Sequence, residues 1–310
     1  MEKDEMLKEI CAILKKGDFE IAEPLFRSAS FDLVAKRERV LLILKALMNI
    51  DALRTEIARE LRLIAKQLSA APIVIGKKSA MGEIIDGVVY SRHGVPIISL
   101  NTFRDFILEN VPPLVYASPG GLYVNIDGEI LRAIRTRYGL SLGQLAEIAG
   151  VSRKAIQLYE EGMSATIDIA LRLEEYLNAE LIKPIDLLRF TEEEEPVKYP
   201  EPRRSNSDIY EKLVDIGYDV YLTTKCPFDA LSKDSREVML TGVEKVERKI
   251  RYKAASFRVL SKIFEKKAFI VVENYSKEEV AGVPVIKKEE LMDMEKSDDV
   301  KKLIEERSAL

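Results

Sequence analysis

The sequence contains few of the residues that build metal centres and nucleophilic active sites. Its 310 residues include one histidine, two cysteines and no tryptophan. His93, Cys11 and Cys226 are isolated from one another in the sequence, so they cannot supply the clustered ligands of a zinc site or a Cys-His pair. Neither a G-x-G-x-x-G turn nor a P-loop is present. We therefore expect a protein without catalytic residues, metal ions or cofactors.

Long apolar runs are also missing. No stretch of eighteen apolar residues occurs, and the N-terminal segment Met1–Met6 is highly charged, unlike a signal peptide. The 48 basic and 52 acidic side chains nearly balance, to a net charge of −4. A net acidic protein still binds DNA where its basic residues gather locally. The sequence therefore predicts a cytoplasmic protein of two or three domains with no membrane partner.

One segment has a spacing that indicates a function. Residues 140–162 read Leu-Ser-Leu-Gly-Gln-Leu-Ala-Glu-Ile-Ala-Gly-Val-Ser-Arg-Lys-Ala-Ile-Gln-Leu-Tyr-Glu-Glu-Gly. A first short helix ends at Gly150, which can adopt the positive φ of a helix C-cap, and Ser152 is a natural N-cap for a second helix over 152–161. The buried side of the second helix carries Ala155, Ile156 and Tyr159, and its outer side carries Arg153, Lys154 and Gln157.

This pattern resembles the Cro and lambda-repressor type of helix-turn-helix, the XRE family, over about fifty residues. The family motif is kept from Leu145 to Ser152, and its later Glu-x-Gly is kept as Glu160 and Gly162. The resemblance implies a five-helix domain, with a fourth helix over 166–177 and a short fifth over 184–188. The chain departs from many members at two positions, with Leu142 in place of a backbone-contacting Gln and Glu161 in place of a basic residue.

The resemblance implies that the second helix enters the major groove of double-stranded DNA at a promoter or operator. Arginine suits guanine and glutamine suits adenine, so we expect base contacts from Arg153, Lys154 and Gln157. We expect phosphate contacts from Ser152, Arg132 and Arg135, and Gln144 completes the predicted DNA-binding set. One such domain reads only about half a turn of DNA, so a homodimer is expected.

The flanks of this segment carry a repeated order of elements. In each copy a helix ends at a glycine, an aspartate follows a phenylalanine, and a strand, a long helix and two short apolar strands come next. The equivalent strands are 40–44 and 238–243, then 72–75 and 269–272, then 94–98 and 282–286. Strands alternating with helices predict an α/β sheet. The predicted domains are an α/β copy at 1–117, the helix-turn-helix at 118–192, an acidic and proline-rich linker at 193–202, a second α/β copy at 203–296 and a charged tail at 297–310.

The order of elements in each copy resembles the restriction-endonuclease-like fold. Active members hold a divalent metal with an Asp and a Glu-x-Lys, and this chain matches with Asp32 and Lys45 but has Ile43 at the Glu position. In the second copy Asp229 is present, but the following strand has neither Glu nor Lys. A single Asp holds Mg²⁺ poorly, so we expect catalytically degenerate domains.

Two alternatives remain open from the sequence. The first is a metal-dependent nuclease or DNA-junction-processing protein that uses the N-terminal α/β domain. The second is a protein-interaction scaffold, because short amphipathic helices also occur in bundles that bind only protein. A basic run over 245–267 also has two interpretations. Such a run is usually a solvated helix face, but it can also neutralise several phosphates.

Overall fold

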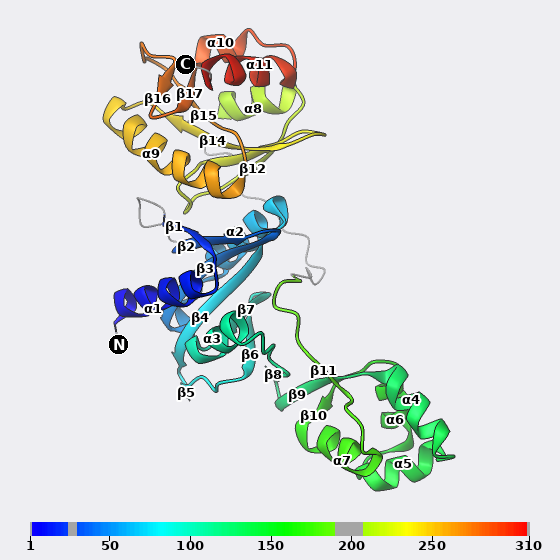
Figure 1. Ribbon diagram of the computed structural model, residues 1–310. Helices are drawn as coiled ribbons and strands as arrows, with labels where there is room; N and C mark the ends of the chain where they lie inside the picture. The colour runs from blue at the N-terminus through cyan, green and yellow to red at the C-terminus, as the bar shows by residue number, and fades with distance from the viewer. Residues whose placement is uncertain (1, 24–29, 190–206, 309–310) are drawn as a thin grey trace. The chain divides into compact units, whose positions relative to one another are not determined.

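The structure is a computed structural model that describes residues 2–23, 30–189 and 207–308 and divides into two compact units (Figure 1). The first unit comprises Met1–Met6, Leu47–Ala52 and Val74–Arg189. The second comprises Leu7–Ala46, Leu53–Ile73 and Phe190–Leu310. The predicted linker at 193–202 lies outside the described residues. No described helix is long and apolar enough to cross a membrane.

The first unit is built on a sheet with the strand order β4-β7-β6-β8-β9-β10, to which β5 adds on β4 and β11 adds on β9. Strands β4 and β7 are parallel, β6 and β7 are antiparallel, and β6 and β8 are parallel. The strands are β4 (Ala71–Ser79), β5 (Gly82–Glu83), β6 (Val88–Arg92), β7 (Val95–Ile98), β8 (Val115–Ser118), β9 (Gly121–Ile126), β10 (Ala165–Thr166) and β11 (Ile182–Lys183), and the unit also holds η1 (Ile50–Ala52) and α3 (Leu100–Leu108).

The predicted domain boundary after residue 117 falls inside β8. Strands β8 and β9 form a hairpin in which Ser118 pairs with Gly121. Gly120 and Gly121 have φ values of 99° and 147°, which few other residues adopt, so they turn the chain within one sheet. The Ser-Pro-Gly-Gly segment therefore joins the α/β region to the helical domain as a hairpin turn, whereas the sequence analysis took it as a break between domains.

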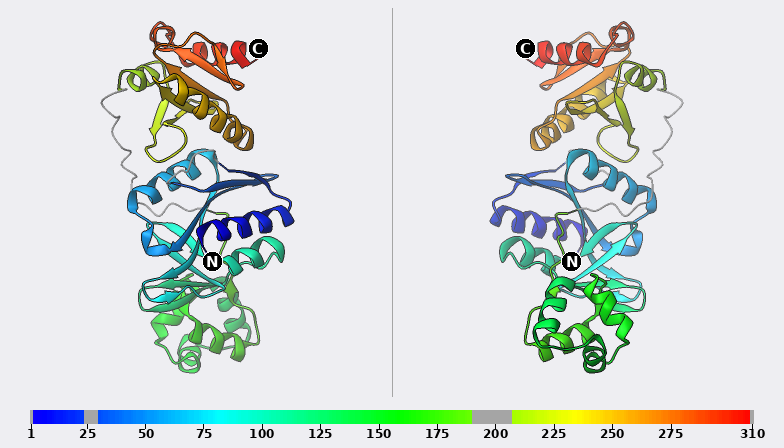
Figure 2. Two further views of the ribbon diagram at one scale, coloured as in Figure 1. Left: turned by 90° about the vertical axis from the view of Figure 1, so that its left-hand side faces the viewer. Right: turned by 90° about the vertical axis from the view of Figure 1, so that its right-hand side faces the viewer.

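The helical domain packs four helices against β9, β10 and β11 (Figures 1 and 2). They are α4 (Gly128–Arg137), α5 (Leu142–Ala149), α6 (Arg153–Glu160) and α7 (Ile167–Leu177). The fifth helix expected at 184–188 is not formed, and the chain instead pairs β11 with β9 and then turns at Leu187. Leu131, Leu145 and Ile156 are fully buried and join α4, α5 and α6 in one core.

The second unit contains two α/β parts. The N-terminal part consists of α1 (Lys3–Lys16), β1 (Glu20–Ala22), β2 (Leu33–Arg37), β3 (Val40–Asn49) and α2 (Thr55–Leu68), although the ends of α1 and β3 belong to the first unit. Strands β1, β2 and β3 are antiparallel, and Leu33 pairs with Leu44.

The C-terminal part of the second unit is a sheet of order β12-β13-β14-β15-β17-β16. Helices α8, α10 and α11 share a core on one face of this sheet, and α9 covers the other face (Figure 1). The elements are α8 (Ser207–Asp215), β12 (Asp219–Leu222), β13 (Ala230–Lys233), β14 (Val238–Glu244), α9 (Glu247–Phe264), β15 (Ala268–Val272), β16 (Glu279–Val280), β17 (Val283–Lys287), α10 (Lys288–Met292) and α11 (Ser297–Ser308).

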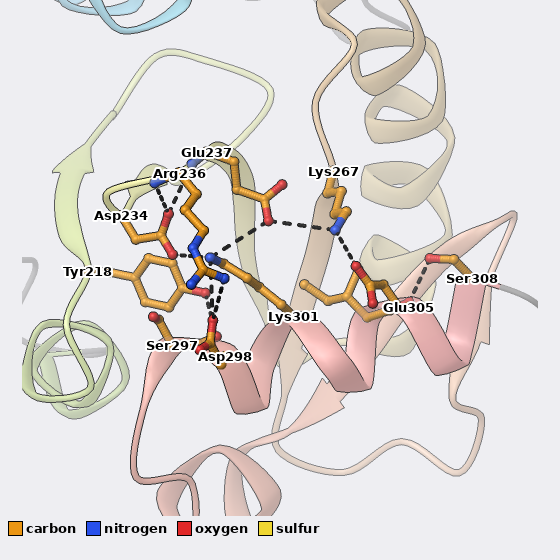
Figure 3. Close-up of polar contacts among 11 residues, drawn as sticks. Tyr218, Asp234, Arg236, Glu237, Lys267, Ser297, Asp298, Lys301, Glu305 and Ser308 are labelled. Carbon is orange, nitrogen blue, oxygen red and sulfur yellow. Dashed lines mark hydrogen bonds and ion pairs between the residues drawn. The ribbon is translucent and has the colours of Figure 1, made fainter.

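The residues predicted to form a charged tail instead form α11, which is part of the C-terminal fold. Val300 and Ile304 are buried in the core that α11 shares with α8 and α10. The Lys301 ammonium pairs with the buried Asp234 carboxylate, and the Tyr218 hydroxyl donates to the carbonyl of Ser297 at 3.0 Å (Figure 3). The apolar stripe of this helix is narrow and lies among charged residues, so the sequence analysis placed the segment outside the second α/β domain.

Candidate nucleic-acid interface

The turn between α5 and α6 is set by local hydrogen bonds. Ser141 caps α5 by accepting from the backbone N–H of Gln144 at 3.2 Å, while the Gln144 Oε1 accepts from the Ser141 N–H at 2.9 Å. Gly150 ends α5 with a φ of 71°, and the N–H of Val151 bonds to the carbonyl of Ala146 at 2.9 Å. These contacts fix the direction in which α6 leaves the turn.

Helix α6 buries one side and exposes the other. The Ser152 hydroxyl caps the helix by accepting from the N–H of Ala155 at 3.1 Å. Ile156 and Tyr159 are buried in the helical core. The side chains predicted to contact bases are all exposed, and they are Arg153, Lys154 and Gln157. The structure therefore gathers these three polar side chains on the solvent side of α6.

The two glutamines among the predicted DNA contacts already have partners within the domain. The Gln157 Nε2 donates to Glu161 Oε1 at 3.0 Å, so base recognition by Gln157 must compete with this bond. The carboxamide oxygen of Gln144 is engaged in the helix cap, which leaves its nitrogen as the donor for a DNA phosphate. Glu161, which the sequence analysis noted only as a departure from the family, therefore has a direct effect on the reading face.

Arg135, expected at a phosphate, is engaged within the helical domain. Its guanidinium donates to both carboxylate oxygens of Glu160 and, at 2.8 Å, to the carbonyl of Leu140. The Arg135 and Glu160 side chains are 16% and 5% exposed. Arg135 thus joins α4 to α6 and to the loop before α5. Arg132 also approaches Glu160, at 3.3 Å, but its side chain is 58% exposed and stays accessible to DNA.

The residues predicted from the nuclease resemblance do lie together. The Asp32 carboxylate accepts from the backbone N–H of Ala46 at 2.8 Å, and Lys45 Nζ lies 3.8 Å from the same oxygen. One carboxylate that is already bonded to an amide and faces an ammonium is a poor donor set for Mg²⁺. Across the described residues, no three His, Cys, Asp or Glu side chains are grouped so that they could hold a metal ion. A divalent metal centre therefore does not fit this site.

In the C-terminal part, a lysine from α9 occupies the space next to Asp229. Lys253 Nζ lies 2.6 Å from Asp229 Oδ2, 2.9 Å from the carbonyl of Val243 and 3.9 Å from Glu244. A Cβ at Gly242 would lie 3.0 Å from the Lys253 Cδ, so the absence of a side chain there makes room for the lysine. The sequence analysis missed Lys253 because it looked for a lysine on the strand.

Comparison with known proteins agrees with both parts of this description. Residues 3–113 match the PD-(D/E)XK superfamily domain, and residues 131–182 match a helix-turn-helix family.

Relatives named "Putative HTH-type transcriptional regulatory protein" align along nearly the whole chain. One from Methanococcoides burtonii is 40% identical over 99% of this chain and 98% of its own length. One from Archaeoglobus fulgidus is 38% identical over 98% of both chains, and one from Methanocella arvoryzae is 38% identical over 97% of this chain and 95% of its own. The exposed face of α6, the nuclease-like N-terminal domain and this full-length similarity place the chain in the family of archaeal HTH-type transcriptional regulatory proteins.

Proposed function

We propose that the protein is a sequence-specific transcriptional regulator that reads the major groove of double-stranded DNA with the helix over 152–161. The observation that carries the proposal is the set of exposed polar side chains on a helix whose opposite face is buried. Arg153, Lys154 and Gln157 read bases in this proposal, and Ser152, Arg132 and Gln144 contact phosphates. A homodimer then binds two half-sites separated by about one helical turn, roughly 34 Å.

The test begins with duplexes selected from a random pool by the full-length protein. We expect Arg153→Ala and Gln157→Ala each to weaken binding to the selected duplex by about 1–3 kcal/mol and to relax base preference at one position. Arg189→Ala is the matched control, because the Arg189 side chain is 86% exposed and lies outside α6. Unchanged selectivity in both α6 variants would refute the assignment of the reading helix.

We also infer that the two α/β domains are repeats of one fold. In the first domain the Asp32 N–H donates to the carbonyl of Leu44, and its carboxylate accepts from the N–H of Ala46. In the second, Asp229 makes the same two bonds with Thr241 and Val243, at the same separations along the chain. The parallel and antiparallel pairing of β4, β7 and β6 likewise has its counterpart in β15, β17 and β16.

We propose that neither α/β domain cleaves DNA. Both aspartates are engaged by a backbone N–H and a lysine, and in the second domain the Lys253 ammonium lies next to both Asp229 and Glu244, where a metal ion would have to bind. Residues 3–113 match the PD-(D/E)XK superfamily, so DNA cleavage is the alternative activity that the experiment has to exclude. Plasmid or branched DNA incubated with the protein and Mg²⁺ should stay intact. Cleavage that Asp32→Ala abolishes would establish the nuclease alternative instead.

A further inference from the structure

Helix α9 carries a concentration of positive charge that the rest of the chain lacks. Between Lys245 and Lys267 there are nine basic and two acidic residues, a net charge of +7 in a chain whose total is −4. Helix α9 starts at Glu247, so it includes the arginines that precede Lys253. Six of the nine basic residues therefore lie on one helix.

Three of these lysines form ion pairs within the fold, and three of the arginines are exposed. Lys245 pairs with Glu273 at 2.6 Å, Lys253 with Asp229 at 2.6 Å, and Lys262 with Glu20 at 3.1 Å. Arg248, Arg251 and Arg258 are exposed, and we call these three residues the basic ridge. Among the described residues, no salt bridge involves Arg248 or Arg258.

The spacing of the basic ridge suits an extended polyanion. Positions 248, 251 and 258 project from the same side of a helix with 3.6 residues per turn, and they span about 15 Å along its axis. Phosphates on one strand of duplex DNA follow each other every ~3.4 Å along the helix axis, so several of them fit within this span. Arginine also matches phosphate geometry with two parallel N–H donors.

Helix α9 begins with Glu247 and continues with Arg248, Lys249, Ile250 and Arg251. The helix macrodipole favours the acidic first residue and disfavours each basic residue in the first turn by about 0.3–1 kcal/mol. The Arg248 guanidinium also lies 5.9 Å from the centroid of the Tyr252 ring. The ridge side chains are therefore exposed while part of their length packs on the helix itself.

We propose that the basic ridge binds the sugar-phosphate backbone of double-stranded DNA, as a sequence-independent contact separate from the reading helix. The choice of duplex DNA as the polyanion rests on the proposed function. The ridge adds affinity on any duplex, whereas Arg153 and Gln157 provide discrimination between duplexes. The helix-turn-helix domain has eight basic and nine acidic residues over 128–190, so this second contact supplies cationic surface that the reading domain lacks.

The test measures how affinity depends on salt. Each lost phosphate contact lowers the slope of log K against log salt by ~0.9. The variant Arg248→Gln, Arg251→Gln, Arg258→Gln should therefore lower the slope by about 2.7, both on the selected duplex and on an unrelated one. The ratio of the unaltered protein's affinity to the variant's affinity should fall roughly 40-fold as the salt concentration rises from 50 to 200 mM. The ratio of affinities for the two duplexes should stay the same.

Two matched variants separate position from charge. Lys8→Gln, Lys15→Gln, Lys16→Gln removes the same total charge from exposed positions of α1 and should leave the slope unchanged. Replacing the three ridge arginines by lysine should restore most of the slope. Circular dichroism checks that each variant keeps the helix content and the unfolding transition of the unaltered protein.

The two proposals fail in different ways. A ridge variant with the slope of the unaltered protein would overturn the inference, even if the selected duplex is preferred. Equal losses of slope in the α1 and ridge variants would also overturn it, because net charge alone would then be responsible. A protein that prefers no duplex would refute the proposed reading helix, while the slope on unrelated DNA would still decide whether the ridge binds the backbone.

Discussion

Glu160 at the end of α6 and Arg135 on α4 form an ion pair that is almost completely shielded from solvent. Both carboxylate oxygens accept from the same guanidinium, at 3.2 Å for the Nη2 contact, and the Glu160 side chain is 5% exposed. The third guanidinium nitrogen of Arg135 donates to the carbonyl of Leu140. The pair therefore ties α6 to α4, and it gives the Glu of the Glu-x-Gly motif a structural role in this chain.

Removing the carboxylate charge should loosen the reading helix. Glu160→Gln leaves the Arg135 guanidinium without its counter-charge in a shielded site, which we expect to destabilise the helical domain by about 3 kcal/mol. Amide hydrogen exchange of α4 and α6 in the full-length protein should accelerate by roughly 100-fold. Glu161→Gln is the control, because it makes the same change at an exposed neighbouring position. Similar exchange rates in the two variants would contradict this account of the pair.

The first residue of α4 has to be glycine because α4 and α6 approach each other closely. A Cβ on Gly128 would lie 2.5 Å from the carbonyl oxygen of Glu160 and 2.6 Å from that of Tyr159. Both atoms belong to backbone, so Gly128→Ala should displace α4 and destabilise the domain by about 1–3 kcal/mol. Gly143→Ala in α5 should instead stabilise it by ~0.5–1 kcal/mol, because a Cβ there has no atom closer than 3.8 Å. Thermal unfolding of both variants checks the opposite signs.

The parts of the fold that local signals determine could be predicted from the sequence. The turn between α5 and α6 needs only Ser141, Gly150 and Ser152, which act within a few residues of their own positions. The exposed face of α6 follows from helical periodicity for the same reason. The strands of both α/β regions could be located because they are short apolar runs bounded by glycine and proline.

What could not be predicted depends on contacts between distant residues. In the sequence, Arg135 is an exposed-looking basic residue suited to a phosphate. Its structural role becomes visible only in the folded chain, where its guanidinium donates to Glu160, 25 positions later. The segment over 184–188 contains apolar residues at helical spacing, but it follows a strand, because Ile182 and Lys183 find partners on β9. Lys301 is likewise typical of a solvated tail in the sequence, whereas in the structure it pairs with Asp234 in the turn after β13.

The Asp234–Lys301 pair makes the stability of the C-terminal domain depend on pH. Burial opposes the ionisation of Asp234, but the Lys301 ammonium and the N–H groups of Glu237 and Arg236 outweigh it and lower the pKa to about 2 (Figure 3). Since the pKa is lower in the folded state than the ordinary value near 3.8, the ionised carboxylate stabilises the fold above that value. The contribution, about 2 kcal/mol, is lost as the pH falls from about 4 towards 2.

Comparison of the protein with its Asp234→Asn variant isolates this contribution from other carboxylates. Near pH 6 the variant should be less stable to urea, because it lacks the charge that Lys301 requires. The difference in the free energy of unfolding should then decrease as the pH falls, since protonation removes the same charge from the unaltered protein. A difference that stays constant between pH 5 and pH 2.5 would mean that the pKa of Asp234 is the same in the folded and unfolded states. The Lys301 ammonium would then give the ionised carboxylate no net stabilisation, and the pair would have no electrostatic role in holding α11 against the sheet.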